Sequence, residues 1–248
     1  MERYSNQNIK DGYNAGIGEA SSKYDNDYEF NRWFIRSRNR AEYYMTYQAI
    51  KHHLADISYQ RCFELGPGPG TWTRLLYRHQ PQASYQLVDI SEAMQGQFML
   101  EMRASGNVTY SVSDIMTFQA DAPFDYFFSS RAVEYLEDKP AFFAKLHSLV
   151  SPGGRGAIIT KNPYHGVRKS KKVAHQGQIP MAQMQTLLTE AGFSNVRCYP
   201  VVVRLPIISR LTSEVSEHLF HKWLGKELTV SKRHRFIESY LVTFTRDA

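Results

Sequence analysis

Three glycines spaced two residues apart form the stretch of this sequence best suited to hold a ligand. Gly66, Gly68 and Gly70 follow the short apolar run Cys62–Leu65 and precede a helical pattern that begins at Thr71. A glycine turn at the carboxyl end of a strand lets the backbone lie directly against a ligand. The stretch therefore predicts a binding loop between a strand and a helix.

Two common phosphate-binding loops do not fit this stretch. A P-loop ends in Gly-Lys followed by Ser or Thr, and the loop contains no lysine. The dinucleotide fingerprint GxGxxG needs a final glycine where Thr71 stands when counted from Gly66. Pro67 and Pro69 also remove two backbone N–H donors that a pyrophosphate would use. The loop favours a ligand that needs close approach and little anion binding.

Two acidic residues end the next two predicted strands. Asp89 follows the run Tyr85–Val88 and comes 23 residues after Gly66, near the spacing of about 20 at which a carboxylate holds ribose hydroxyls. Asp114 follows the run Val108–Val112 and could accept a hydrogen bond from an adenine amine. Either acid alone fits a surface position or a helix cap. At the ends of consecutive strands, together with the loop, they predict a nucleoside site.

Short apolar runs and helical patterns alternate around these residues. A helix is expected over Asn39–Asp56 with Asn39 as its N-cap, and further helices are expected to start at Thr71, Ser91, Asp138 and Pro180. The apolar runs are Cys62–Leu65, Tyr85–Val88, Val108–Val112, Phe124–Phe128, Ala157–Thr160, Ser194–Val203 and Ile237–Thr245. This alternation is typical of βαβ units on a mostly parallel sheet, and the final run predicts a terminal antiparallel strand.

Length and composition fit one globular domain with an appendage. The 248 residues suit a single core, and 42% hydrophobic with 22% charged residues excludes a disordered chain or a fibre. A net charge of +6 favours anionic partners without indicating a dedicated nucleic-acid binder. Cys62 and Cys198 have no zinc-site spacing, so no metal is expected. The start of the chain has no apolar signal and no transmembrane stretch is seen, so a cytoplasmic location is expected.

With these motifs in place, the sequence resembles the class I S-adenosylmethionine-dependent methyltransferases over about residues 39–245. The resemblance rests on Glu64-x-Gly66-x-Gly68-x-Gly70, Asp89, Ser113-Asp114 and the strand Phe124–Ser129. It implies an α/β, Rossmann-like, seven-stranded and mostly parallel sheet of order 3-2-1-4-5-7-6 with helices on both faces. We expect a methyltransferase domain over residues 39–248 and an N-terminal helical lid over residues 1–38.

The resemblance also implies the cofactor, S-adenosylmethionine with S-adenosylhomocysteine as its product, and the residues that hold it. Those residues are Glu64, Gly66, Gly68, Gly70, Asp89, Ile90, Met94, Ser113, Asp114, Ile115, Ser130 and Arg131. In this arrangement Asp89 takes the ribose and Glu64 serves the amino end of the methionine. Met94 and Ile115 enclose the adenine, and Asp114 meets its amine.

The groups that would act on a methyl acceptor are harder to predict, because transfer of an activated methyl group depends mainly on positioning. Glu134 and Tyr135 follow the fourth strand and could hold or deprotonate a hydroxyl or an amine. The basic stretch 165–175 offers His165 or His175 as a base and cations for an anionic acceptor. Each of these features also has a structural interpretation: Glu134 as an exposed helix carboxylate, Tyr135 as a packed ring, and residues 165–175 as a solvated loop.

Two apolar features allow more than one interpretation. Tyr24, Tyr28 and Trp33 in the N-terminal region could contact the substrate with their aromatic faces, or simply pack. Apolar residues recur at helical spacing over residues 208–223, which is typical of a helix facing the core and also suits a surface that touches lipid.

Together these observations predict an enzyme that transfers a methyl group from S-adenosylmethionine to O or N of a small organic acceptor, in a biosynthetic pathway. The acceptor could be anionic, and no nucleic-acid partner is expected. Three alternatives remain: a lipid or quinone methyltransferase at a membrane surface, an RNA or protein methyltransferase, and a non-catalytic protein that binds the cofactor.

Overall fold

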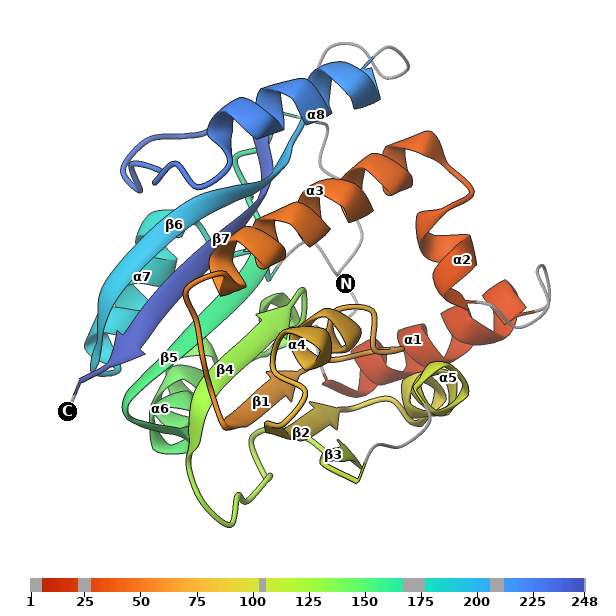
Figure 1. Ribbon diagram of the computed structural model, residues 1–248, viewed down its shortest axis with the longest axis vertical. Helices are drawn as coiled ribbons and strands as arrows, with labels where there is room; N and C mark the ends of the chain where they lie inside the picture. Colours follow the sequence, from red (N-terminus) through yellow and green to blue (C-terminus); the bar gives the residue numbers. More distant parts are fainter. Residues whose placement is uncertain (1–5, 22–27, 103–105, 167–176, 206–211, 248) are drawn as a thin grey trace.

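A seven-stranded sheet forms the centre of the molecule (Figure 1). The computed structural model describes residues 6–21, 28–102, 106–166, 177–205 and 212–247. The strands are β1 (Arg61–Leu65), β2 (Ser84–Asp89), β3 (Val108–Val112), β4 (Phe124–Ser130), β5 (Val150–Lys161), β6 (Phe193–Val203) and β7 (Ile237–Arg246). Their order is β3-β2-β1-β4-β5-β7-β6, and β7 runs antiparallel to both of its neighbours, β5 and β6. The predicted sheet order and the antiparallel last strand are confirmed.

The central strands are apolar along nearly their whole length because helices cover both faces of the sheet. In β4, Tyr126, Phe127 and Phe128 are all buried, and Phe63 of β1 stacks on Phe127 with ring centroids 5.9 Å apart. These continuous apolar runs fix β1 and β4 side by side in the middle of the sheet. Their carboxyl ends therefore open at the same edge.

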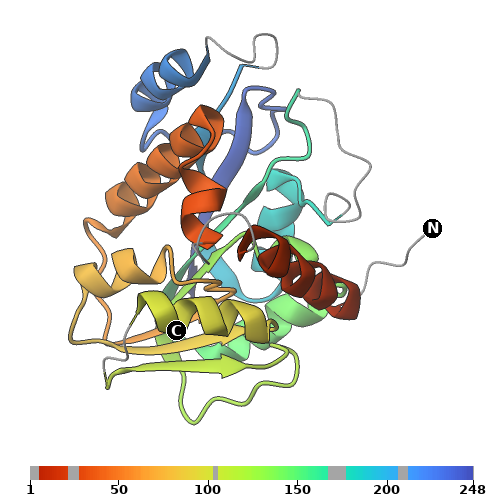
Figure 2. The same cartoon turned by 90° about the vertical axis from the view of Figure 1, so that its right-hand side faces the viewer.

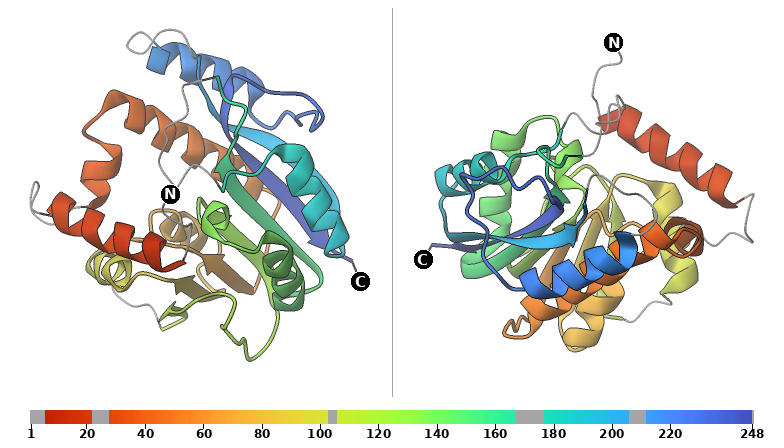
Figure 3. Two further views of the ribbon diagram at one scale, coloured as in Figure 1. Left: turned by 180° about the vertical axis from the view of Figure 1, so that it is seen from behind. Right: turned by 90° about the horizontal axis from the view of Figure 1, so that it is seen from above.

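Helices form a layer on each face of this sheet (Figure 3). α3 (Ser37–Leu54), α4 (Thr73–His79) and α8 (Thr212–Trp223) lie on one face, and α6 (Lys139–Leu149) and α7 (Met181–Glu190) on the other. Short polar residues start two helices: Ser91 accepts the N–H of Met94 at the start of α5 (Glu92–Glu101), and Asp138 accepts the N–H of Ala141 in α6. The helices expected after Thr71, Ser91, Asp138 and Pro180 are all present.

One local prediction was wrong, and another feature is only partly buried. Asn39 does not cap α3; it lies inside the helix, which begins at Ser37, and its side-chain amide donates to the Arg32 carbonyl at 2.7 Å. In α8 the apolar positions do not all face the core: Val215 and Trp223 are 47% and 36% exposed, whereas Phe220 is buried. Residues 208–211 lie outside the described residues.

Two N-terminal helices stand at the edge where the parallel strands end (Figures 1 and 2). α1 (Asn6–Ser21) is joined to α5 by the Lys10–Glu92 ion pair at 2.6 Å and by the Ser91 hydroxyl, which donates to Asn14 Oδ1 at 2.7 Å. α2 (Tyr28–Trp33) connects it to α3. The division into a lid over residues 1–38 and a domain over residues 39–248 stays a prediction.

Candidate functional site

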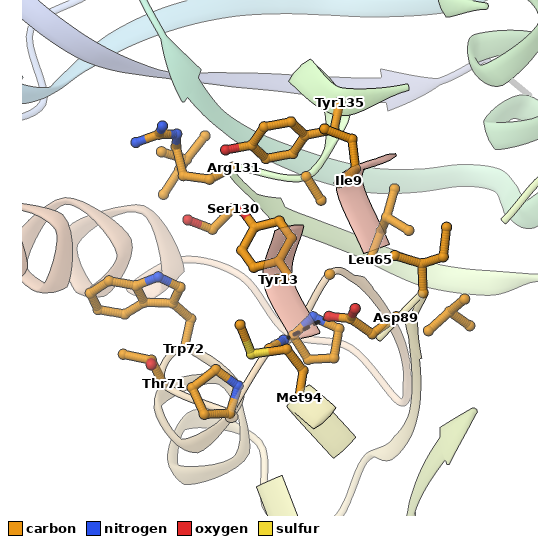
Figure 4. A pocket seen from close by; sticks show the side chains of 18 of the residues that line it. Ile9, Tyr13, Leu65, Thr71, Trp72, Asp89, Met94, Ser130, Arg131 and Tyr135 are labelled. Atoms are coloured by element: carbon orange, nitrogen blue, oxygen red, sulfur yellow. Dashed lines mark hydrogen bonds between the residues drawn. The ribbon is translucent and has the colours of Figure 1, made fainter. Parts of the chain in front are cut away.

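A cavity lies at the carboxyl ends of β1, β2, β3 and β4, and residues of α1 and α2 also line it. Figure 4 shows the cavity with Ile9 and Tyr13 of α1 among its lining residues. Its empty volume is about 1190 Å³, which includes the space that opens to solvent. From the predicted site it is lined by Gly66, Gly68, Asp89, Ile90, Met94, Ser113, Asp114, Ile115, Ser130, Arg131, Tyr135, Tyr28 and Trp33. Residues from four strand ends, far apart in the sequence, thus meet around one space.

All three glycine N–H groups of the loop are used within the protein. Gly66 donates to the Val88 carbonyl at 2.8 Å, Gly68 to Asp89 Oδ2 at 3.1 Å, and Gly70 to the Pro67 carbonyl at 3.0 Å. Since the two prolines have no N–H, little of the loop is left to bind a phosphate. The loop instead offers a close-fitting wall to the cavity, as its sequence predicts.

Gly66 is required where it stands, and its replacement by alanine is expected to be costly. Its φ is +70°, and a Cβ there would lie 2.4 Å from the Cβ of Ala132. We expect Gly66→Ala to lower the free energy of unfolding by about 2 kcal/mol or more, from the left-handed backbone and the overlap. Urea denaturation measures this change. Gly12→Ala, in open space on α1, is the matched control and should not destabilise the protein.

Asp89 connects the loop to the next helix and still faces the cavity. Its Oδ2 accepts the Gly68 N–H at 3.1 Å and its Oδ1 accepts the Ser91 N–H at 3.0 Å. Burial raises the pKa of Asp89, and these backbone donors act against that rise. Each carboxylate oxygen has further lone pairs, so the group can also accept two hydrogen bonds from a vicinal diol.

Two apolar side chains and a second carboxylate line the cavity in addition to Asp89. Met94 and Ile115 line it and are almost fully buried, at 4% and 2% exposure. Asp114 lines the same region and accepts the Met116 N–H at 2.9 Å through Oδ1. A flat heteroaromatic ring with an amino group would match this pairing of apolar walls and a carboxylate.

A network of charges stands behind the other end of the cavity. Arg131, at a φ of +66°, donates from Nε to Glu134 Oε1 at 2.9 Å. The Glu134 carboxylate is buried and also accepts from the Thr160 hydroxyl at 2.8 Å and the Lys161 N–H at 3.1 Å. Burial alone would raise the pKa of Glu134, but the Arg131 guanidinium lowers it below its usual range. Glu134 is therefore ionised and holds Arg131 in place. It is not among the described residues that line the cavity.

Glu42 of α3 brings a carboxylate to this end of the cavity. It pairs with Lys161 at 2.9 Å and lies 3.5 Å from the Arg204 guanidinium. Burial would raise the pKa of Glu42, but Lys161 and Arg131 lower it well below its usual range. The group is therefore ionised at neutral pH and engaged by cations.

Glu64 is not among the described residues that line the cavity. It is 1% exposed, and its carboxyl accepts the Thr73 hydroxyl at 2.7 Å. Burial raises the pKa of Glu64 to about 8. Gly70 likewise turns away from the cavity, toward the Phe98 ring.

The raised pKa of Glu64 predicts a pH-dependent stability. The unfolded chain loses this proton near pH 4.5 and the folded protein near pH 8, so the folded form binds the extra proton between these values. The contribution of Glu64 is therefore full below pH 4.5 and falls as the pH rises toward 8, by up to about 1.4 kcal/mol per pH unit. Glu64→Gln should remove this part of the slope in urea titrations from pH 5 to 8; exposed Glu190→Gln should not.

The remaining predicted residues are distributed differently. Tyr135 lines the cavity and its ring meets Tyr13 of α1 edge-on, with centroids 5.9 Å apart (Figure 4). Trp33 is buried against Trp72 and also borders the cavity, as does Tyr28. His165 lies elsewhere, with Nε2 3.3 Å from the Arg204 carbonyl, and burial lowers its pKa. Tyr24 and His175 lie outside the described residues.

The sequence reasoning missed several residues that line the cavity, among them the polar residues Tyr13, Arg32, Glu42 and Thr46. They belong to α1, α2 and α3, which precede the glycine loop and carry no local motif. The tyrosine-rich composition of the N-terminal region was the only signal for them. Among the residues that the structure describes, no group of three or more His, Cys, Asp or Glu side chains is placed to hold a metal ion.

Comparison with known proteins identifies the class of domain. Residues 63–154, which include the loop, Asp89, Asp114 and Ser130, match the model of the methyltransferase domain family. Together with the sheet order, this match supports the resemblance of these residues to the class I S-adenosylmethionine-dependent methyltransferase superfamily.

Individual relatives are distant. Malonyl-[acyl-carrier protein] O-methyltransferase 1 of Ilyobacter polytropus is 26% identical over 141 residues, 52% of this chain and 53% of that protein. Trans-aconitate 2-methyltransferase of Yersinia pestis is 28% identical over 149 residues, 58% of this chain and 54% of that protein. The chain thus spans about half the length of these curated relatives.

A solved structure supports the fold over a longer stretch. An S-adenosylmethionine-dependent methyltransferase of Thermotoga maritima, described as a possible histamine N-methyltransferase, superposes with a TM-score of 0.65 at 16% identity. The match covers 93% of this chain and all of that one. At this identity the likeness speaks for the fold alone.

Proposed function

We propose that this protein transfers a methyl group from S-adenosylmethionine to O or N of a small organic acceptor. The observation that carries the proposal is the meeting of the glycine loop, Asp89 and Asp114 around one cavity. When bound, the cofactor supplies a methyl group already activated on a sulfonium. Asp89 would hold the ribose hydroxyls, Met94 and Ile115 would enclose the adenine, and Asp114 would accept from its amine.

The remaining work falls to residues that orient the acceptor and exclude water. Tyr13 and Tyr135 meet across the cavity, and burial raises the pKa of Tyr13, so it stays a neutral phenol. Glu42 is held as a carboxylate by its cations and is a weak base. Neither the Tyr13 phenol nor the Glu42 carboxylate is therefore suited to remove a proton from the acceptor. Among the described residues that line the cavity, this favours an acceptor atom that is already nucleophilic when it binds. In this proposal Glu134 positions Arg131 rather than touching the acceptor.

Calorimetry with S-adenosylhomocysteine is the direct test of the cofactor site, and wild-type protein that binds none would refute the proposal. Transfer of labelled methyl from S-adenosylmethionine to metabolite, lipid and RNA fractions would then identify the acceptor class. Label in a small-metabolite fraction is expected. Cofactor binding with no labelled fraction would favour the non-catalytic alternative.

The lipid alternative rests on the apolar positions of α8, of which Val215 and Trp223 reach the surface. None of the helices that the structure describes has an apolar stretch of the length needed to cross a membrane. The cations of residues 167–175, on which the RNA or protein alternative depends, lie outside the described residues. These alternatives, the anionic character of the acceptor and the cytoplasmic location stay predictions.

A further inference from the structure

Arg32 of α2 lines the cavity, and the proposed function gives it no role. Its guanidinium carbon lies 4.7 Å from the centroid of the Trp33 ring. Trp33 is itself buried and meets Trp72 edge-on, with centroids 5.9 Å apart. A guanidinium that rests on a fixed aromatic face keeps its plane while its N–H edge stays available for a planar, bidentate acceptor.

The other charges around the cavity are already matched. Arg131 is paired with Glu134 at 2.8 Å, and Glu42 with Lys161 at 2.9 Å. Asp89 accepts two backbone N–H groups. Within the described part of the chain, Arg32 takes part in none of the ion pairs.

The surroundings of Arg32 would strengthen its attraction for an anion. Its side chain remains accessible to solvent. Burial would lower the pKa of Arg32, but Tyr28, Tyr13 and Glu42 raise it. The charge is therefore permanent and shares the cavity with the tyrosines that line it. Among the described residues Arg32 has no ion-pair partner, and a cation that lines a partly apolar cavity attracts anions more strongly than one on an open surface.

We propose that Arg32 binds a carboxylate group of a ligand in this cavity. This inference rests on the proposed function, because that function supplies the ligands. Two sources offer the same chemistry: the amino-acid end of the cofactor, and an acceptor that carries a carboxylate. The planar fork of the guanidinium matches both oxygens of either group.

The cofactor source is tested by calorimetry with two ligands on wild type and Arg32→Gln. S-adenosylhomocysteine carries the amino-acid carboxylate, whereas 5′-methylthioadenosine has the same nucleoside and sulfur without it. If the cofactor is the source, Arg32→Gln weakens S-adenosylhomocysteine binding about ten- to a hundredfold, the loss expected for a charge-assisted bidentate contact. Binding of methylthioadenosine then changes by less than about twofold.

The acceptor source is tested with malonate, and with its uncharged diamide, on protein saturated with S-adenosylhomocysteine. If the acceptor is the source, wild type binds malonate better than the diamide. Arg32→Gln then loses this preference while keeping its S-adenosylhomocysteine affinity. Arg32→Lys, which keeps the charge but loses the fork, should recover part of the affinity in either case. Arg36→Gln, an exposed arginine outside the described lining, is the matched control and should behave as wild type.

Two results would overturn the proposal. Arg32→Gln could leave S-adenosylhomocysteine and malonate binding unchanged, or it could weaken methylthioadenosine as much as S-adenosylhomocysteine, which would indicate a disturbed fold. If the wild type binds S-adenosylhomocysteine in those cases, the proposed function is still supported and only the role of Arg32 is refuted. If the wild type binds neither nucleoside, the proposed function is refuted. Malonate binding to the free protein then tests Arg32 alone: loss of that binding in Arg32→Gln supports its role, and unchanged binding refutes it.

Discussion

Replacing Asp89 with alanine is expected to weaken S-adenosylhomocysteine binding by more than about a hundredfold. Each charge-assisted hydrogen bond to a ribose hydroxyl contributes about 1.5 to 3 kcal/mol, and the carboxylate can form two. The same change removes the acceptor of the Gly68 and Ser91 N–H groups, which hold the loop in place. Calorimetry measures the affinity, and thermal unfolding shows whether the variant remains folded.

Asp89→Asn separates the two contributions of this side chain. The amide keeps one oxygen that can accept from Gly68 or Ser91, and it loses the charge that faces the cavity. We expect its affinity to lie between those of wild type and the alanine variant, with stability close to wild type. A folded Asp89→Ala protein that binds as tightly as wild type would remove Asp89 from the ligand site.

Loss of the Glu134 carboxylate should cause the largest change in stability. Glu134→Ala leaves the Arg131 guanidinium without the partner 2.8 Å away and removes the acceptor of the Thr160 hydroxyl. Breaking a buried ion pair by removing one partner costs about 3 to 5 kcal/mol. We expect a fall of that size in the free energy of unfolding, measured by urea denaturation.

Removing both charges should be milder than removing one. In Glu134→Gln with Arg131→Met the amide still accepts from Thr160, and no unpaired cation remains, so much of the stability should return. A Glu134→Ala protein as stable as wild type would show that the pair holds nothing in place. Glu134→Gln that loses methyl transfer while keeping full stability and cofactor binding would point back to a catalytic role.

The sequence predicted the sheet and the nucleoside end of the site because both depend on local patterns. The continuous apolar runs of β1 and β4 require burial on both faces, and the glycine loop and Asp89 follow strands whose carboxyl ends share one edge. The resemblance implied Met94 and Ile115, which stand a few residues beyond the ends of β2 and β3 and line the cavity.

The part of the cavity lined by the N-terminal helices could not be predicted in the same way. Arg32 and Glu42 come from helices that precede the first strand. Glu42 pairs with Lys161, which lies 119 residues later in the sequence. Glu134 looked available beside Tyr135, but the turn after β4 directs its carboxylate inward to Arg131 and Thr160. Which way a side chain points within a turn depends on tertiary contacts that no spacing rule contains.

Two of the three tryptophans in the chain stand at the cavity wall, which gives the protein an intrinsic optical probe. Trp33 and Trp72 lie in contact with each other, and Tyr43 stacks on Trp72 at 5.3 Å, whereas Trp223 lies on α8. Indole emission responds to the polarity and quenching groups around the ring. Filling the cavity would therefore change the fluorescence of the unlabelled protein, and Trp223→Phe would sharpen that signal by removing the emission of the remaining tryptophan.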